Sequence, residues 1–343
     1  MWQRLWYGSP LLALPLTPLS LLYGTGVAIR RGLYRLGLKG VRRFPVPVVV
    51  VGNLTVGGTG KTPLVIWLSR HLQAQGWRPG IVARGYGGRA RHWPQQVRPD
   101  SDPQTVGDEP VLLARRTGRP VCVAPDRPAA VAALLEHTDT DIVISDDGLQ
   151  HLALGRDLEI LVIDGKRGLG NGWLLPAGPL REGARRRHEV DLAISTEVSW
   201  QGLPVMHLER PRLRALTAED DTGPLSRLAG VRVHAVAGIG HPERFFRLLE
   251  GQGLEVIRHP FPDHHPFRAG DLAFGDDRPV VMTEKDAVKC RSFARPNHWL
   301  VEIEARPQQA FVDALQRSLT EITHGQKTAR DPGLPPVQGQ ARL

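Results

Sequence analysis

Residues 48–68 constrain this chain most, because they combine a buried strand, a glycine loop and a helix. Val48 to Val51 form an unbroken β-branched run, which is typical of a strand covered on both faces of a parallel sheet. Glycines follow, and Lys61 and Thr62 come directly before an apolar helical pattern. Free backbone N–H groups in such a loop, together with the positive end of the helix, predict an anion-binding site.

The loop is close to the pattern G-x-x-x-x-G-K-[ST], although Thr55 stands where that pattern has its first glycine. Lys61 is placed to contact the outer phosphates of a nucleotide, and the Thr62 hydroxyl to ligate magnesium. A purely structural glycine loop would explain the glycines but not the Lys-Thr pair. We therefore predict that the phosphates bind along Thr55, Val56, Gly57, Gly58, Thr59, Gly60, Lys61 and Thr62.

A second motif, DIVISDDGLQH at 141–151, brings two acids to the end of a buried strand. Because the carboxyl ends of parallel strands meet at one edge of a sheet, Asp146 and Asp147 should lie beside the glycine loop. Carboxylates there can hold magnesium directly or through water. Thr62, Asp146 and Asp147 are thus the predicted metal ligands, with a capping pair before Gly148 as the alternative.

Other polar residues also stand at predicted strand ends. Arg84 and Tyr86 close the strand predicted from residue 79, where either a ligand contact or a plain turn explains them. His151 follows a turn and is a further candidate contact. Asp108 and Glu109 precede an apolar helical run, and from the residues alone we interpret them as a helix cap with a favourable first-turn charge.

The N-terminal segment has no charged residue from position 5 to position 29 and ends in Arg30 and Arg31. Its length would permit a membrane span, but several glycines and prolines interrupt it. A secretory signal does not fit, because no clear small-residue cleavage site follows. We predict a helix lying in the membrane surface, with Trp2, Trp6 and Tyr7 inserted and arginines at the headgroups; a docking helix and a full span are the alternatives.

Charge and cysteine usage narrow the possible partners. The net charge of +9 over 343 residues points to an anionic partner, which could be nucleic acid, acidic lipid or a phosphorylated substrate. The arginine clusters are not interleaved with stacking aromatics, so no nucleic acid is expected. Cys122 and Cys290 suggest neither a disulfide scaffold nor a zinc site, which fits a reducing compartment.

The alternation of predicted strands and helices indicates an α/β fold: a P-loop NTPase-like doubly wound parallel sheet with a second, smaller α/β domain. Turns and mixed charges between residues 209 and 230 suggest the boundary. We predict a membrane-associated helical segment at 1–43, a nucleotide-binding domain at 44–215, a second domain at 228–324 and a disordered tail at 325–343.

Seven segments in one order resemble the tetraacyldisaccharide 4'-kinases, the lipid A kinases of Gram-negative envelope synthesis. They are GNLTVGGTGKTP (52–63), ARGYGG (83–88), GDEP (107–110), SDDGLQH (145–151), PAGPLRE (176–182), FPDHH (261–265) and TEKDAVK (283–289). Thr55 looks like that family's own form of the loop. The Arg-rich stretch directly after Glu182 and the C-terminal tail carry no motif of this kind.

The resemblance implies a kinase that transfers the γ-phosphate of ATP, with Mg²⁺, to the 4'-hydroxyl of a tetraacyldisaccharide 1-phosphate, forming lipid IVA. It also implies a peripheral or monotopic position on the cytoplasmic face of the inner membrane. The family's acid and histidine map to Asp108 of GDEP as the base and to His264 of the DHH piece as its partner. Arg84, Tyr86, His151 and Arg181 lie in these motifs as candidate contacts to the acylated disaccharide.

The same loop and carboxylates would also serve a nucleotide-driven switch or a partition-type ATPase acting on a membrane-associated partner. That alternative gives no reason for the pairing of Asp108 with His264 or for an apolar N-terminus. No obligate protein partner is evident. The active site is expected in a cleft between the two domains, because His264 and the glycine loop belong to different ones.

Overall fold

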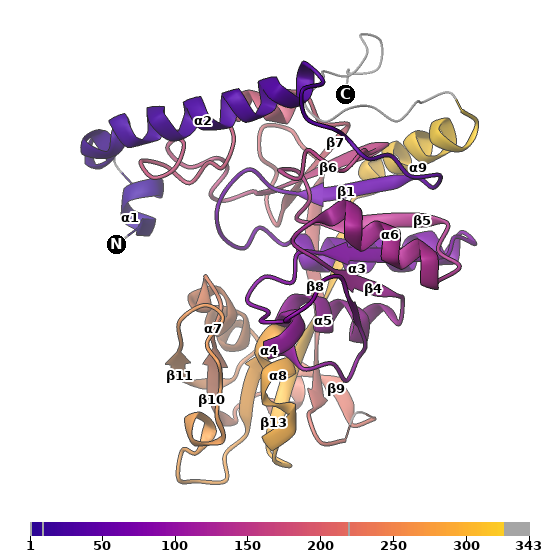
Figure 1. Cartoon of the computed structure of the whole chain (residues 1–343). Coiled ribbons are helices and arrows are strands. Elements are labelled where there is room, and N and C mark those ends of the chain that lie inside the picture. The colour runs from indigo at the N-terminus through magenta and orange to yellow at the C-terminus, as the bar shows by residue number, and fades with distance from the viewer. Residues whose placement is uncertain (1, 9, 219, 326–343) are drawn as a thin grey trace.

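The computed structural model describes residues 2–8, 10–218 and 220–325, and within them the strands join into one sheet (Figure 1). The strand order is β11-β10-β12-β13-β8-β7-β6-β1-β5-β2-β4-β3, with β9 paired to β8. The strands are β1 (Val48–Gly52), β2 (Pro79–Ala83), β3 (Gln95–Val97), β4 (Val121–Val123), β5 (Ile142–Asp146), β6 (Leu158–Asp164), β7 (Leu192–Thr196), β8 (Val205–Ala215), β9 (Thr222–Pro224), β10 (Arg232–Ala237), β11 (Glu255–Pro260), β12 (Val280–Thr283) and β13 (His298–Pro307).

Helices flank this sheet and extend the chain at its N-terminus. The α-helices are α1 (Trp2–Tyr7), α2 (Thr17–Arg35), α3 (Lys61–Ala74), α4 (Pro103–Val106), α5 (Asp108–Thr117), α6 (Arg127–His137), α7 (Pro242–Gly251), α8 (Glu284–Cys290) and α9 (Gln309–Thr323). Short 3-10 helices are η1 (Pro10–Leu16), η2 (Ala184–His188), η3 (Leu225–Leu228), η4 (Ala269–Leu272) and η5 (Arg291–Phe293). The predicted tail lies, from residue 326 on, outside the described residues.

The centre of the sheet is the predicted parallel α/β arrangement. β1 pairs in parallel with β5 on one side and with β6 on the other, and all five of its residues are buried. The β-branched run at 48–51 therefore packs against both covering layers, as its lack of polar alternation predicted. α3 begins at Lys61, two residues before the predicted start at Pro63.

The second half of the molecule is a parallel sheet of β10, β11, β12 and β13, and it is continuous with the first. The connection is β8, which pairs in parallel with β7 and antiparallel with β13. The region 209–230, predicted as a boundary of turns, instead contains half of β8, then β9 and η3. Charged residues and Pro211 hide this strand in the sequence because β8 is only partly buried. The division into two domains stays a prediction.

The polar, proline-containing stretch 89–105 is not only a loop. It contains the short strand β3, which pairs antiparallel with β4 at the sheet edge, and the single turn of α4 begins at Pro103. Three strand residues with two of them partly exposed give too weak an alternation to be recognised in sequence.

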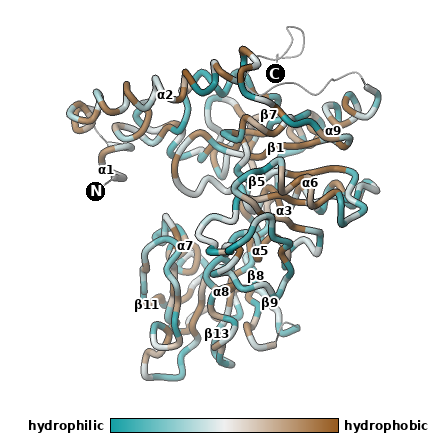
Figure 2. The backbone as a smooth tube through the Cα atoms, viewed as in Figure 1, coloured by the Kyte–Doolittle hydropathy of each residue, from teal (hydrophilic) through white to brown (hydrophobic). Residues whose placement is uncertain are grey.

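At the N-terminus, α2 is a long helix that lies across one end of the sheet (Figure 1). It runs through Gly24 and Gly26, which the sequence had suggested would break it. Residues 11–35 are long and apolar enough to cross a membrane by length and composition, and little of this stretch is buried. Leu22 is 71% exposed, and apolar residues recur along α2 in Figure 2.

A segment at 174–182 fills the space between α2 and the glycine loop. The Ser20 hydroxyl of α2 donates a hydrogen bond to the Leu174 carbonyl at 2.7 Å and accepts one from the Ala177 amide at 2.9 Å. At the other end of the segment, the Pro179 carbonyl accepts a hydrogen bond from the Val56 amide at 2.8 Å. The segment 174–182 thus joins the exposed N-terminal helix to the glycine loop.

Candidate active site

The glycine loop leaves β1 and reaches α3 through two glycines with left-handed backbone. Gly57 has φ of 107° and Gly60 has φ of 91°, conformations that L-residues with a side chain rarely adopt. Thr55 is buried and bridges to Leu180, and the Val56 amide is already engaged by the segment 174–182. The first part of the loop is therefore fixed by the fold, and the two left-handed glycines lie in the remaining part, from Gly57 to Thr62.

Lys61 stands at the start of α3 and points toward the end of β5. Its ammonium lies 3.1 Å from the Asn53 Oδ1 and 3.5 Å from Asp147 Oδ1. The guanidinium of Arg181 donates to both oxygens of Asp147 at 3.0 and 2.9 Å. These two cations hold the pKa of Asp147 well below its usual range, although burial acts to raise it.

Asp146 is in the opposite electrostatic situation. It is 3% exposed, and its Oδ1 accepts no hydrogen bond from any described residue. Burial, reinforced by the charge of Glu109, raises the pKa of Asp146 to about 7. An orphaned buried carboxylate oxygen that faces a phosphate loop is suited to a divalent cation. Within the described residues, no group of three or more His, Cys, Asp or Glu side chains is placed to hold a metal ion, at this site or at any other.

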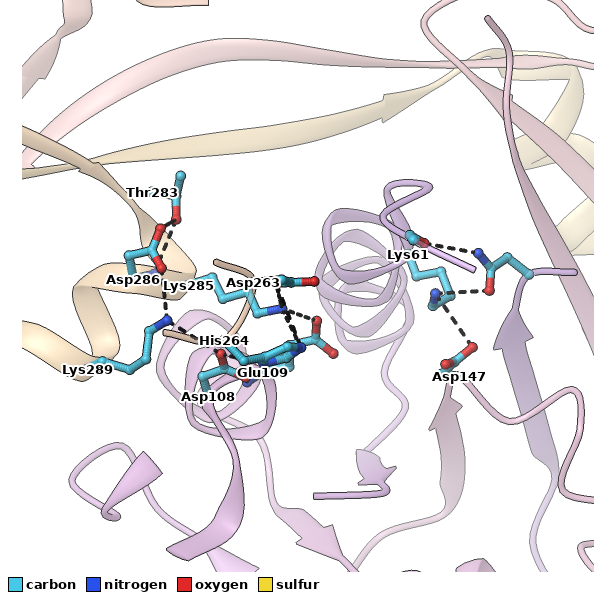
Figure 3. A network of polar contacts seen from close by, with 12 residues as sticks. Lys61, Asp108, Glu109, Asp147, Asp263, His264, Thr283, Lys285, Asp286 and Lys289 are labelled. Atoms are coloured by element: carbon cyan, nitrogen blue, oxygen red, sulfur yellow. Dashed lines mark hydrogen bonds and ion pairs between the residues drawn. The ribbon is translucent and has the colours of Figure 1, made fainter. Parts of the chain in front are cut away.

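Asp108 and His264 meet although 156 residues separate them (Figure 3). Asp108 is the first residue of α5 and is 5% exposed, while His264 comes from the loop after β11, where its φ is 60°. His264 Nδ1 lies 3.1 Å from Asp108 Oδ2, and the ring of Tyr86 packs on His264 with centroids 5.0 Å apart. The structure thus joins two residues that only the family resemblance had paired.

The pair shifts the acid–base behaviour of both members. Burial acts to raise the pKa of Asp108, but the hydrogen bond from His264 and the charges of Lys285 and Lys289 outweigh it and lower that pKa. The hydrogen bond to Asp108 raises the pKa of His264, against burial and the charge of Lys285. Asp108 is therefore held as a carboxylate. Its other oxygen accepts a hydrogen bond from the Glu109 amide at 2.9 Å. The predicted side-chain cap is wrong, because Gly107 is the N-cap residue of α5, whereas the predicted acidic first turn is confirmed.

Helix α8 fixes this pair from the second half of the molecule (Figure 3). Lys285 Nζ lies 3.2 Å from His264 Nε2 and 3.1 Å from Glu109 Oε1. Lys289 Nζ lies 3.9 Å from Asp108 Oδ2 and 2.9 Å from Asp286 Oδ1. Figure 3 shows these residues as one group and Lys61 with Asp147 as another.

Both groups border one cleft of about 1430 Å³ between the halves of the molecule. All the predicted loop residues line it, as do Asp146 and Asp147, whereas Asp108 is buried beside the wall that Glu109 and His264 form. The cleft also extends to Tyr23 and Arg31 of α2. A phosphate chain on the loop and a long substrate reaching the exposed helix can therefore share this space.

The four candidate substrate contacts line the cleft but differ in their freedom. Arg84 and Tyr86 are exposed, whereas burial and the charges of Arg127 and Arg84 lower the pKa of His151 to about 3, so its ring is neutral. Arg181 is held by Asp147 and by the Asn53 carbonyl at 3.0 Å. Arg181 thus supports the start of the glycine loop and also lines the cleft.

Several site residues were not singled out from the sequence. Asn53 orients Lys61, and its Nδ2 donates to the Thr55 carbonyl at 2.8 Å. Arg127 is 1% exposed and donates to the Asp146 carbonyl at 3.0 Å. Arg167 donates to the Gly58 carbonyl at 2.6 Å. Asn53 lies inside a motif that had been identified, but Arg127 and Arg167 gave no sequence signal.

Comparison with known proteins yields a consistent result. The family profile described as tetraacyldisaccharide-1-P 4'-kinase (LpxK) matches residues 12–320. The tetraacyldisaccharide 4'-kinase of Alkalilimnicola ehrlichii is 56% identical over 90% of this chain and 92% of its own length. That of Nitrosococcus oceani is 52% identical over 90% of this chain and 91% of its own length.

A solved structure agrees with the fold. The crystal structure of LpxK from Aquifex aeolicus in complex with ATP superposes with a TM-score of 0.76 at 28% identity. The match covers 91% of this chain and 99% of that chain, so it includes both halves of the sheet.

Proposed function

The chain belongs to the tetraacyldisaccharide 4'-kinase family, and from this premise we propose how its residues carry out the reaction. The enzyme transfers the γ-phosphate of ATP to the 4'-hydroxyl of tetraacyldisaccharide 1-phosphate, a step of lipid A biosynthesis. Family membership over most of the chain excludes the alternative of a switch or partition-type ATPase. The observation that carries our assignment of roles is the contact of His264 with Asp108 at 3.1 Å beside the cleft.

Asp108 is the general base. A sugar hydroxyl is a poor nucleophile, so a carboxylate within hydrogen-bond reach accelerates the reaction by accepting its proton as the new P–O bond forms. The bond between the γ-phosphorus and the β–γ bridging oxygen breaks in the same displacement, and ADP leaves. His264 orients the Asp108 carboxylate through Nδ1 and helps to keep it ionised.

Lys61 stabilises the negative charge that develops on the transferring phosphoryl group. The amides from Gly57 to Thr62 hold the phosphates, while Asn53 and Asp147 keep the Lys61 ammonium in place. Because Asp147 is already engaged by two cations, Asp146 and the Thr62 hydroxyl are the residues that would hold Mg²⁺. When bound, the ion neutralises phosphate charge.

The exposed apolar helix α2 supports an enzyme that lies on a membrane surface. Leu22 and its exposed neighbours enter the lipid surface, so the cleft that begins at Tyr23 faces the substrate's acyl chains. Because the reaction uses ATP, we place the enzyme on the cytoplasmic face of the inner membrane. The acylated disaccharide then reaches Arg84, Tyr86 and His151 without leaving the surface.

The decisive experiment measures formation of phosphorylated glycolipid from labelled ATP by Asp108→Asn. We expect a loss of kcat of about 10²- to 10⁴-fold with the affinity for ATP nearly unchanged. His265→Asn is the matched control, because His265 contacts Asp271 rather than the dyad. Near-normal turnover by Asp108→Asn, or a larger loss for His265→Asn than for His264→Asn, would overturn these assignments.

A further inference from the structure

Lys285 is the only ammonium that the structure brings within hydrogen-bond reach of the His264 ring in the described part of the chain. Its Nζ lies 3.2 Å from His264 Nε2, while His264 Nδ1 faces Asp108 on the opposite side of the ring. Lys285 is held there by Glu109 at 3.1 Å and by Asp263 at 3.4 Å. His264 is therefore placed between a carboxylate and an ammonium.

Asp108 and Lys285 require different hydrogen-bonding roles of the two ring nitrogens of His264. An ammonium has donors only, so the Nε2 that faces it must be an acceptor, and the proton of the neutral ring must then be on Nδ1. Nδ1 is also the atom that can donate to Asp108. Protonation of Nε2 would direct an N–H toward the ammonium and add a like charge. Lys285 therefore favours one tautomer and disfavours the imidazolium.

The position of Lys285 is built into α8. Asp286, fully buried, accepts hydrogen bonds from the Gly238 amide at 2.9 Å and from the Thr283 hydroxyl at 2.6 Å. Glu284 forms an ion pair with Arg116 of α5, and α5 and α8 pack together. The helix that carries Lys285 is thus fixed to the helix that carries Asp108.

We propose that Lys285 is a positioning residue for phosphoryl transfer, which holds His264 as the neutral Nδ1-protonated tautomer so that Asp108 is oriented by a hydrogen bond and keeps its basicity. This deepens the proposed roles of Asp108 and His264 and rests on them for its catalytic part. The arrangement of Lys285, His264 and Asp108 then has one purpose: the imidazole donates a hydrogen bond to the base without becoming a second cation.

The groups that face this ring define its titration. They are Asp108, Asp263, Lys285 and Tyr86, with Lys289 reaching Asp108 and Glu109 reaching Lys285. The charges of the three carboxylates raise the pKa of Lys285 despite burial, so its ammonium persists over the working pH range. The charge of Lys285 in turn acts to lower the pKa of His264. Removing it should extend the imidazolium form to higher pH.

The test compares Lys285→Met with Lys285→Arg in the full-length enzyme. For Lys285→Met we expect kcat/KM at pH 7 to fall about 10-fold and the acidic limb of its pH profile to move upward by about one pH unit. Lys285→Arg keeps a cationic donor and should retain the wild-type limb. Arg306→Met is the matched control, because it also removes a cation, but one that is 70% exposed, pairs with Glu209 and does not line the cleft. Its pH profile should be that of the wild type even where its stability is lower.

A second readout does not depend on activity. ¹⁵N-histidine spectra of the detergent-solubilised protein, with His264 assigned by its loss in His264→Gln, report the tautomer and its titration directly. We expect Nδ1 protonation in the wild type and a higher midpoint in Lys285→Met. An unchanged His264 tautomer and titration midpoint in Lys285→Met would overturn the proposal. So would a loss of kcat/KM that is the same at every pH, with the acidic limb of the pH profile at its wild-type position. If Asp108→Asn were fully active while Lys285→Met still shifted the His264 signals, the catalytic role of Asp108 and His264 would be overturned, but the effect of Lys285 on the tautomer would stand.

Discussion

The glycine loop and the Asp108–His264 pair form the two ends of one cleft, but they are assembled in different ways. The loop is built from neighbours in the sequence, and its shape follows from left-handed glycines and from the contact of Val56 with Pro179. The pair is built from α5 and from a loop 156 residues away, and α8 holds it together. The proposed phosphate-binding residues are thus contiguous in the chain, with one tertiary support at Pro179, whereas the proposed base and its partner are brought together only by the tertiary fold.

The largest effect is expected from removing the charge of Lys61 in the glycine loop. Lys61→Met should lower kcat by about 10³-fold or more, because a fixed cation at the transferring phosphoryl group is lost in a water-poor cleft. Turnover of labelled ATP into phosphorylated glycolipid measures the effect. Arg98→Met is the matched control, since the Arg98 side chain is 76% exposed and its ion pair is with Asp100, which is also exposed. A loss below tenfold would mean that Lys61 does not act on the reacting phosphate.

A smaller effect separates the two acids after β5. Asp146→Asn should raise the Mg²⁺ concentration needed for half-maximal activity by about 10- to 100-fold, because the orphaned oxygen is the one available to the ion. Asp147→Asn should instead weaken the placement of Lys61 and Arg181, with little change in that concentration. Titration of activity against Mg²⁺ distinguishes them, and the reverse pattern would exchange the two roles.

The exposed helix should show a weaker, separable effect. Leu21→Asp combined with Leu22→Asp should reduce binding to anionic lipid vesicles by about 10-fold, because two apolar side chains no longer transfer from water into lipid. Activity toward substrate in detergent micelles should change less. Val198→Asp is the control, since Val198 is 45% exposed far from α2 in sequence. Unchanged co-sedimentation with vesicles would make α2 a docking helix only.

The smallest expected effect is a pH dependence of stability. The folded pKa of His264 is raised, so the stabilisation from its bond to Asp108 is fully present below the unfolded pKa of about 6.5 and is lost as the pH rises through the folded value. The Tm of His264→Gln should therefore lie below that of the wild type by about 1–2 °C more at pH 6 than at pH 9. In an Asp108→Asn background this difference should vanish. A penalty that grows with pH would contradict the contact.

The same contrast explains what could be predicted from the sequence. β1, the loop and the acids after β5 follow from apolar runs and glycines in consecutive order, so their placement needs no tertiary information. Asp108 read as a simple cap, and only family resemblance paired it with His264. Lys285 had no recognised role, because its contacts lie on two other elements. β8 was missed for a related reason: its charged residues are partly exposed and its partner β13 comes much later in the chain.

The segment 174–182 carries a consequence for regulation by the bilayer. The Leu174 carbonyl at one end accepts a hydrogen bond from Ser20 of the exposed apolar helix α2, and the Pro179 carbonyl at the other end accepts one from the Val56 amide of the glycine loop. If the segment 174–182 couples membrane binding to nucleotide binding, thermodynamic linkage requires that each event change the affinity of the other by the same factor. If insertion of α2 into the membrane raises the affinity for ATP, then bound ATP must raise the affinity for the membrane by the same factor. The ATP-bound enzyme would then have a longer residence time on the membrane, where its acceptor lipid is found.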